Sequence, residues 1–270
     1  MKVKILENEY WWGGIVNCGF DMPYHKGSDC EFDINAGGEL CCDQFMPLLV
    51  SSLGRYVWSE EEFKGIVKNG EIILSGRADF ELCEGFGNLK GAYLAASAKY
   101  FTPTGVMPDA KFWKVPQYNT WAELGHNQNA EGIIKYGESI IENGLPAGVM
   151  MIDGGWQEDY GVFEFNLRKI PDPKAMIEKL HSLGFSVMLW VSPIVASAGA
   201  RYKELRNKGY LVKNKNGEPV IRQWWSGYST VLDFSNPKAV EWFTDELEKL
   251  KEKYGADGFK FDAGDVYFYD

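Results

Sequence analysis

The sequence predicts an α/β protein in two parts, an N-terminal β-sandwich followed by the first half of a TIM (β/α)8 barrel. Two observations predict this fold class. Short runs of β-branched and aromatic residues, separated by turn signals, fill roughly the first 110 residues, whereas apolar strands alternate with amphipathic helices from Pro116 onward. We therefore expect a sandwich domain over residues 1–110 and an incomplete barrel domain over residues 111–270.

Closely spaced short strands are the basis of the sandwich prediction. The turn signals between them include Asn69-Gly70 and the Ala-Gly-Gly of residues 36–38. No long helical period is visible in this region, so the prediction contains no helix there. The clearest expected strands are Phe45–Val50, Gly54–Trp58, Glu71–Leu74 and Asp79–Leu82.

Strand–helix alternation with local stop signals predicts the barrel. Asp172 followed by Pro173 is typical of a helix start, as is Asn236 followed by Pro237. Gly184 and Gly255 are typical stops. The expected strands are Tyr118–Trp121, Gly148–Ile152, Ser186–Val191 and Phe259–Phe261, and the expected helices cover 133–141, 173–183 and 237–254.

Four parallel strands are half of an eight-stranded barrel, which needs roughly 250 residues for itself. A half barrel exposes a long parallel edge, which is an aggregation liability. We therefore expect the natural chain to continue past Asp270. Two half barrels pairing in an oligomer are the alternative.

Charge and hydropathy limit the partners. The 270 residues carry 28 Lys and Arg against 38 Asp and Glu, a net charge of -10. Nucleic acids and anionic membranes both need a positive surface, so neither is an expected partner. The sequence contains neither the apolar region of a signal peptide nor a run long enough to span a bilayer, which predicts a cytoplasmic location.

Cofactors are not expected either. The five cysteines show no CxxC pair, and their odd number favours reduced thiols. No spacing of His, Cys and carboxylate residues is typical of a metal site. The cysteines are Cys18, Cys30, Cys41, Cys42 and Cys83.

Candidate functional residues follow the expected strands. Asp153 comes after the second strand, Trp190 lies near the end of the third and Asp262 follows the fourth. Active sites of barrels lie at the carboxyl ends of strands, so these side chains are expected to converge. Carboxylates accept hydrogen bonds from hydroxyl groups and an indole stacks on a sugar ring, so the pattern favours a neutral sugar and the chemistry of glycoside cleavage.

Several motifs in the same order resemble glycoside hydrolase family 31. Residues 258–265 (GFKFDAGD) resemble the motif in which the family carries its catalytic nucleophile. Segments 163–173, 189–193 and 231–237 resemble further barrel motifs, and 47–58 resembles the N-terminal domain. The pieces at 224–227 and 261–264 are most similar to the branch that includes the myogenesis-regulating glycosidase and bacterial relatives, which favours α-galactosides over α-glucosides.

The resemblance implies roles for individual residues. Asp262 corresponds to the nucleophile of a retaining α-glycosidase, and Asp153 to a residue that hydrogen-bonds the outer hydroxyls of the bound sugar. Trp190 would form a wall of the pocket, and Lys260 would keep the Asp262 carboxylate ionised by proximity. Trp156 and Trp225 are predicted as further substrate contacts.

Two departures from the family pattern limit this prediction. Gly154 stands where close relatives often carry a second acidic residue, which leaves the sugar open between α-galactoside and α-glucoside. No residue of the sequence matches the family's acid/base Asp, which we expect beyond Asp270. The double displacement needs two carboxylates about 5 to 5.5 Å apart. Because the second carboxylate is not found in this sequence, the chain by itself is expected to be inactive.

Other interpretations of the same residues remain open. Asp262 is also compatible with a helix cap, and Trp190 with a core position. A non-catalytic carbohydrate-binding protein is one alternative function. A metal-dependent barrel enzyme with Asp153, Asp262 and Asp265 as ligands is another.

Overall fold

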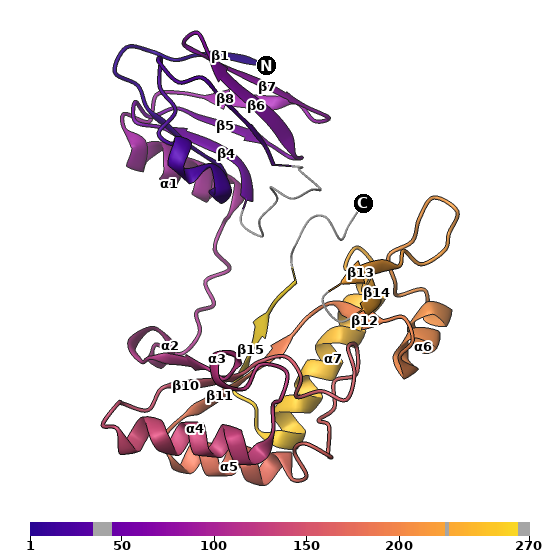
Figure 1. Ribbon diagram of the computed structural model, residues 1–270. Coiled ribbons are helices and arrows are strands. Elements are labelled where there is room, and N and C mark those ends of the chain that lie inside the picture. Colours follow the sequence, from indigo (N-terminus) through magenta and orange to yellow (C-terminus); the bar gives the residue numbers. More distant parts are fainter. Residues whose placement is uncertain (35–44, 225–226, 264–270) are drawn as a thin grey trace. The chain divides into compact units, whose positions relative to one another are not determined.

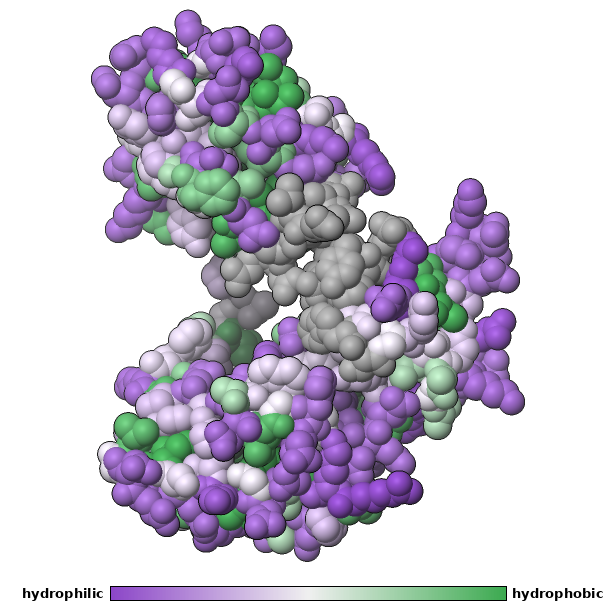
Figure 2. Space-filling view, in the orientation of Figure 1, coloured by the Kyte–Doolittle hydropathy of each residue, from purple (hydrophilic) through white to green (hydrophobic). Residues whose placement is uncertain are grey.

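The computed structural model describes residues 1–34, 45–224 and 227–263, and the chain forms two compact units. Unit 1 is Met1–Val106 and unit 2 is Met107–Ala263 within the described residues. No helix in these ranges is long and apolar enough to cross a membrane. The faces of both units that Figure 2 shows are mostly hydrophilic, with smaller hydrophobic patches.

Unit 1 contains two four-stranded antiparallel sheets, in the orders β1-β7-β6-β3 and β2-β4-β5-β8 (Figure 1). Side chains from both sheets share one core, with Val3, Trp11, Leu49 and Phe63 all nearly inaccessible. The four strands expected from sequence are confirmed as β4, β5, β7 and β8. The bounds are β1 Lys2–Lys4, β2 Trp11–Ile15, β3 Cys30–Asp33, β4 Phe45–Ser51, β5 Tyr56–Ser59, β6 Phe63–Lys68, β7 Glu71–Gly76 and β8 Phe80–Cys83, with the 3-10 helix η1 at Val16–Asp21.

The expectation that unit 1 lacks a helix is wrong, because α1 spans Leu89–Tyr100. The Asn88 side chain accepts a hydrogen bond from the Gly91 N–H and begins this helix. The buried face is Ala92 and Ala96. Such small side chains produce no apolar stripe in the sequence, so helical periodicity does not reveal α1.

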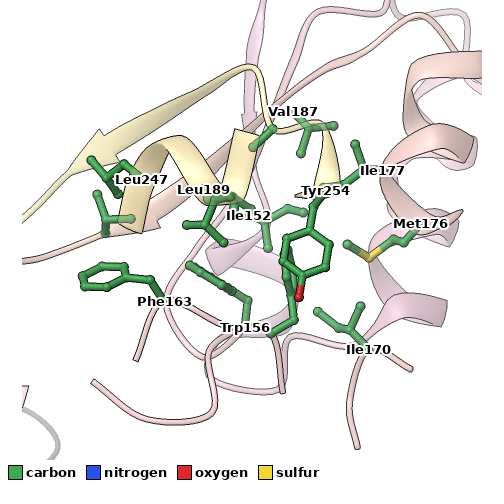
Figure 3. Close-up of a cluster of buried hydrophobic side chains, with 14 of the residues drawn as sticks. Ile152, Trp156, Phe163, Ile170, Met176, Ile177, Val187, Leu189, Leu247 and Tyr254 are labelled. Atoms are coloured by element: carbon green, nitrogen blue, oxygen red, sulfur yellow. The ribbon is translucent and has the colours of Figure 1, made fainter. Parts of the chain in front are cut away.

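Unit 2 is built on a four-stranded parallel sheet in the order β15-β11-β10-β9. Helices α4 and α5 lie side by side beneath the sheet in Figure 1, and α5 contacts both β11 and α7. Figure 3 shows the core between these layers, where Ile152, Leu189 and Tyr254 surround the Trp156 ring. The bounds are β9 Gln117–Asn119, α4 Ala130–Glu142, β10 Val149–Ile152, α5 Pro173–Ser182, β11 Ser186–Val191, α7 Pro237–Tyr254 and β15 Gly258–Phe261.

Local signals placed most of these elements correctly. The Asp172 carboxylate accepts a hydrogen bond from the Ala175 N–H at the start of α5, and the Asn236 side chain caps α7. Gly255 ends α7 in the left-handed conformation, with φ 84°. The four parallel strands agree with part of a barrel, while the expected continuation past Asp270 stays a prediction.

The first expected barrel strand, Tyr118–Trp121, is too long. β9 ends at Asn119, and Trp121 begins the short helix α3, Trp121–Leu124. The Asn119 Oδ1 accepts a hydrogen bond from the Trp121 N–H at 2.8 Å, so the side chain turns the backbone out of the strand. Another short helix, α2, covers Lys111–Lys114.

The segment that connects β11 to α7 contains a small antiparallel sheet, in the order β12-β14-β13. A turn lies at Asn216 and Gly217, where the Gly217 N–H bonds to the Asn214 carbonyl at 2.9 Å. The bounds here are β12 Ile194–Ala196, α6 Ala200–Lys208, β13 Arg222–Trp224 and β14 Gly227–Val231.

Candidate active site

Polar side chains meet at the carboxyl edge of the parallel sheet, as the sequence predicts. Val149, Met150 and Met151 of β10 pair with the strands on both sides in parallel register, so the strand ends lie at one edge. A cavity of about 270 Å³ opens there. Its polar lining is formed by Asn119, Asp153, Lys260 and Asp262.

Asp153 is the most buried of the charged groups, with 5% of its surface exposed. Its Oδ2 accepts hydrogen bonds from Asn119 Nδ2 and Lys260 Nζ, each at 3.0 Å. Its Oδ1 accepts one from the Gly154 N–H at 2.7 Å. Buried carboxylates need such donors, and these three hold the side chain in one orientation.

Asp262 is held from both sides of its carboxylate. The Trp190 Nε1–H donates to Oδ2 at 2.5 Å and the Ala263 N–H donates to Oδ1 at 2.9 Å. The Asp262 N–H itself bonds to the Val191 carbonyl at the end of β11. Ala263 has φ 66°, a left-handed conformation that costs a residue with a Cβ about 1–2 kcal/mol. The backbone thus accepts local strain directly after this carboxylate.

Lys260 connects the two carboxylates. Its Nζ lies 3.0 Å from Asp153 Oδ2 and 3.6 Å from Asp262 Oδ2, and 37% of its side chain is exposed. Two negative charges therefore share one positive charge, and one N–H direction of the ammonium remains for a ligand. The arrangement leaves a net negative pocket.

Aromatic rings form the walls above these charges. Trp121 and His126 lie edge to face, with centroids 4.7 Å apart, and both line the cavity. Tyr160 packs edge to face against Trp190 with centroids 5.9 Å apart. Trp121 keeps 43% of its surface exposed, so an apolar face is available to a ligand.

Of the other two predicted tryptophans, only Trp156 falls within the described residues. Trp156 is fully buried, and its Nε1–H donates to the Trp190 carbonyl at 2.8 Å. It has no exposed surface for a substrate, so the structure places it beneath the site as a support for Trp190. Trp225 and Asp265 lie outside the described residues. Trp224 is buried and stacks near Trp190, with centroids 6.4 Å apart.

A metal ion is not favoured at this position. Among residues 1–34, 45–224 and 227–263, no three His, Cys, Asp or Glu side chains are arranged to hold one. The Lys260 ammonium also occupies the place between Asp153 and Asp262 where a cation would bind. The donors and acceptors suit hydroxyl groups instead.

A sequence profile decides the family of the chain. The profile of the glycosyl hydrolases family 31 TIM-barrel domain matches residues 117–269, which is more than half of the chain. The chain belongs to glycoside hydrolase family 31. The resemblance seen in the sequence motifs is therefore confirmed.

Two relatives that carry glycosidase names agree with this assignment. The chain is 31% identical over 171 residues to the myogenesis-regulating glycosidase of Mus musculus, which aligns 63% of this chain and 24% of that protein. It is 34% identical over 182 residues to the alpha-xylosidase XylQ of Lactiplantibacillus pentosus, aligning 64% of this chain and 23% of that protein. The alignments thus span about a quarter of the length of these relatives.

Solved structures of family 31 share the fold. The dextranase of Flavobacterium johnsoniae superposes with a TM-score of 0.78 at 18% identity, covering 97% of this chain and 33% of that one. An alpha-xylosidase from a soil metagenome gives 0.73 at 21% identity, covering 97% and 37%. Sandwich and barrel architecture therefore extend over the chain as in these family members.

Sequence reasoning missed four of the nine described residues that line this pocket. Asn119, Trp121, His126 and Tyr160 were not predicted as site residues, and Trp121 was assigned to a strand. Only Asn119 and Trp121 carried a signal, because both belong to the expected strand Tyr118–Trp121, whose carboxyl end lies at the same edge as Asp153. The others reach the pocket through loops whose path depends on tertiary contacts.

Proposed function

We propose that this protein acts in the hydrolysis of terminal α-linked sugars by a retaining, double-displacement mechanism. The observation that supports the proposal most is the Asp262 carboxylate, hydrogen-bonded by Trp190 and facing Lys260 in an aromatic pocket at the carboxyl edge of a parallel sheet. Membership of family 31 supports the same reaction class.

In the proposed first step, Asp262 attacks the anomeric carbon of the sugar, and the glycosidic C–O bond breaks. The N–H groups of Trp190 and Ala263 fix the carboxylate for this attack, and the Lys260 ammonium lies 3.6 Å from its Oδ2. A β-linked glycosyl ester forms on Asp262. Water then cleaves this ester and regenerates the carboxylate, so the product keeps the α configuration.

Protonation of the leaving oxygen needs a second carboxyl group. We assign this role to no residue within 1–34, 45–224 or 227–263, since Asp153 is occupied by three donors and accepts, rather than donates, hydrogen bonds. Asp153 is proposed instead to bind sugar hydroxyls. The ammonium of Lys260 would donate to a hydroxyl beside it.

The proposed substrates are α-glucosides and α-galactosides, with α-xylosides added because two similar proteins carry the name alpha-xylosidase. A neutral sugar fits a pocket with carboxylate acceptors, one shared ammonium and indole walls. Phosphorylated or carboxylated sugars would be repelled by the net negative charge of the pocket.

Aryl α-glycosides test the reaction. Full-length protein is assayed on 4-nitrophenyl α-glucoside, α-galactoside and α-xyloside beside the variant Asp262→Ala. We expect kcat to fall by about 10⁴-fold or more on the accepted sugar, the size typical of losing a catalytic nucleophile. Azide added to the variant is expected to restore turnover with a β-glycosyl azide as product, and equal turnover by both proteins would contradict the nucleophile assignment.

A second candidate function is non-catalytic carbohydrate binding. It is favoured by the hydrogen-bond donors and acceptors around Asp153, which suit sugar hydroxyls without requiring a general acid. Calorimetric binding of methyl α-glycosides, with no release of sugar from any aryl glycoside by the full-length protein, would support this candidate over hydrolysis.

A further inference from the structure

We propose that Asn119 is a positioning residue of the sugar pocket, whose carboxamide fixes the orientation of Asp153. The inference rests on the proposed function only in that Asp153 binds a sugar hydroxyl. It assigns Asn119 no contact with the reacting atoms. What it adds is a dependence of sugar binding on a neutral amide at the end of β9.

Both ends of the Asn119 amide are committed. Its Oδ1 accepts the Trp121 N–H at 2.8 Å, and its Nδ2 donates to Asp153 Oδ2 at 3.0 Å. A backbone N–H can only donate, so the amide oxygen must face Trp121. The NH₂ group is thereby directed at Asp153, so the Trp121 N–H determines the orientation of the amide.

Asp153 depends on this donor because few others reach it. An ionised carboxylate accepts about four hydrogen bonds, and Asp153 receives three, from Asn119, Lys260 and the Gly154 N–H. One acceptor direction is left for a sugar hydroxyl. Without the Asn119 donor, Lys260 alone would hold Oδ2, and the exposed ammonium is free to turn toward Asp262 instead.

Charge makes the neutrality of Asn119 essential. The ionisable groups lining the same pocket are Asp153 from the end of β10, Lys260 and Asp262 from β15 and its end, and His126 and Tyr160 from the loops. Two carboxylates already share one ammonium. A third carboxylate at position 119 would lie within hydrogen-bond distance of Asp153, and the two like charges would repel one another instead of forming a hydrogen bond, until one of them takes up a proton at lower pH.

The test compares two variants that differ in which hydrogen bonds of residue 119 they retain. Asn119→Asp keeps an acceptor for the Trp121 N–H but replaces the donor to Asp153 with a negative charge. Asn119→Ala removes both hydrogen bonds. Binding of methyl α-D-glucopyranoside, α-D-galactopyranoside and α-D-xylopyranoside to the 270-residue chain is measured by calorimetry, relative to the unmodified chain at each pH.

We expect both variants to weaken binding about tenfold near neutral pH, the size typical of a hydrogen bond to a charged group. Toward about pH 5, the carboxyl introduced by Asn119→Asp takes up a proton and donates to Asp153, so binding recovers toward that of the unmodified chain. Asn119→Ala contains no such group and stays weak. A purely structural role would give no recovery at lower pH.

Gln117→Ala is the matched control. Gln117 lies on the same strand, donates to the Phe112 carbonyl and does not line the sugar pocket, so binding is expected to be unchanged. Circular dichroism checks that each variant is folded, and if Asn119→Ala is not, the pH dependence of Asn119→Asp decides alone. Unaltered binding by Asn119→Asp at neutral pH, or an equal loss at both pH values, would overturn the inference. If the unmodified chain binds none of the three sugars, the proposed function fails as well.

Discussion

Each unit holds a group of charged side chains in which carboxylates meet a cation, and the two groups differ in how completely they are paired. In unit 1, the Glu9 side chain is fully buried and the Arg55 side chain is 9% exposed. Glu9 accepts hydrogen bonds from Arg55, Ser51 and the Leu6 N–H, while Arg55 also donates to Glu84. In unit 2, Lys260 and Asp262 remain 37% and 27% exposed.

The difference separates a structural group from a binding group. The Glu9–Arg55 group uses its donors and acceptors within the protein, and the Arg55 guanidinium also lies 5.2 Å from the centre of the Trp11 ring. The Asp153–Lys260–Asp262 group keeps hydrogen-bonding directions that open into a cavity. Removing one partner from a completely paired buried group destabilises a fold, whereas incomplete pairing leaves hydrogen-bonding groups available to a ligand.

Removing the cation from the buried group is expected to have the largest effect on stability. Arg55→Met leaves the Glu9 carboxylate buried without its main partner, which lowers the free energy of unfolding of unit 1 by about 3–5 kcal/mol. Native-state hydrogen exchange of β5 and β6 peptides measures this change, with peptides of β10 and β11 as the internal reference. A loss below about 1 kcal/mol would show that the group contributes no more than an exposed ion pair.

The same change in unit 2 is expected to alter binding rather than stability. Lys260→Met lowers the free energy of unfolding by less than about 1 kcal/mol, because the ammonium is partly exposed. It weakens binding of a methyl α-glycoside by about tenfold or more, because Asp153 and Asp262 lose their shared counter-charge. Lys251→Met is the control for both measurements, because it removes an exposed ion pair with Glu248 on α7. A large loss of stability in Lys260→Met with unchanged sugar affinity would contradict the assignment of this group to binding.

Acid is expected to affect unit 1 through Glu9. Burial raises the pKa of this carboxyl, but the hydrogen bonds from Arg55, Leu6 and Ser51 outweigh burial, and the pKa lies below its usual value of 4.5. Folding therefore favours the ionised form, and this contribution is complete above the usual pKa and is lost as the pH falls through the lower, folded pKa. Urea unfolding of the unmodified chain and Glu9→Gln at several acidic pH values tests this, and the variant is expected to lose less stability on acidification. Parallel profiles would contradict it.

The sequence was sufficient where structure is decided locally. Asp172 and Asn236 predicted helix starts because their side chains cap the first turn, and β11 was predicted from Ser186 to Val191 as found. The positions of Asp153 and Asp262 followed from strand ends alone. Their hydrogen bonds with Asn119 and Trp190 did not, because these pairs are separated by 34 and 72 positions in the chain.

Other features escaped the sequence for the same physical reason. Trp156 was predicted as a substrate contact, yet it is buried against Phe165, with ring centroids 4.6 Å apart. α1 was missed because Ala92 and Ala96 pack closely without an apolar stripe. Packing of this kind depends on the shape of the partner surface, which a local pattern does not contain.

Covalent trapping tests the central claim, that Asp262 is the nucleophile of this pocket, most directly. Full-length protein is incubated with 5-fluoro-α-D-glucosyl and 5-fluoro-α-D-galactosyl fluorides, whose fluoride leaves without help from a general acid, and the digest is analysed by mass spectrometry. We expect one glycosyl adduct, on the peptide that contains Asp262, and none in Asp262→Ala, while Asp153→Asn still forms it more slowly. An adduct on another residue, or one that survives Asp262→Ala, would contradict the account.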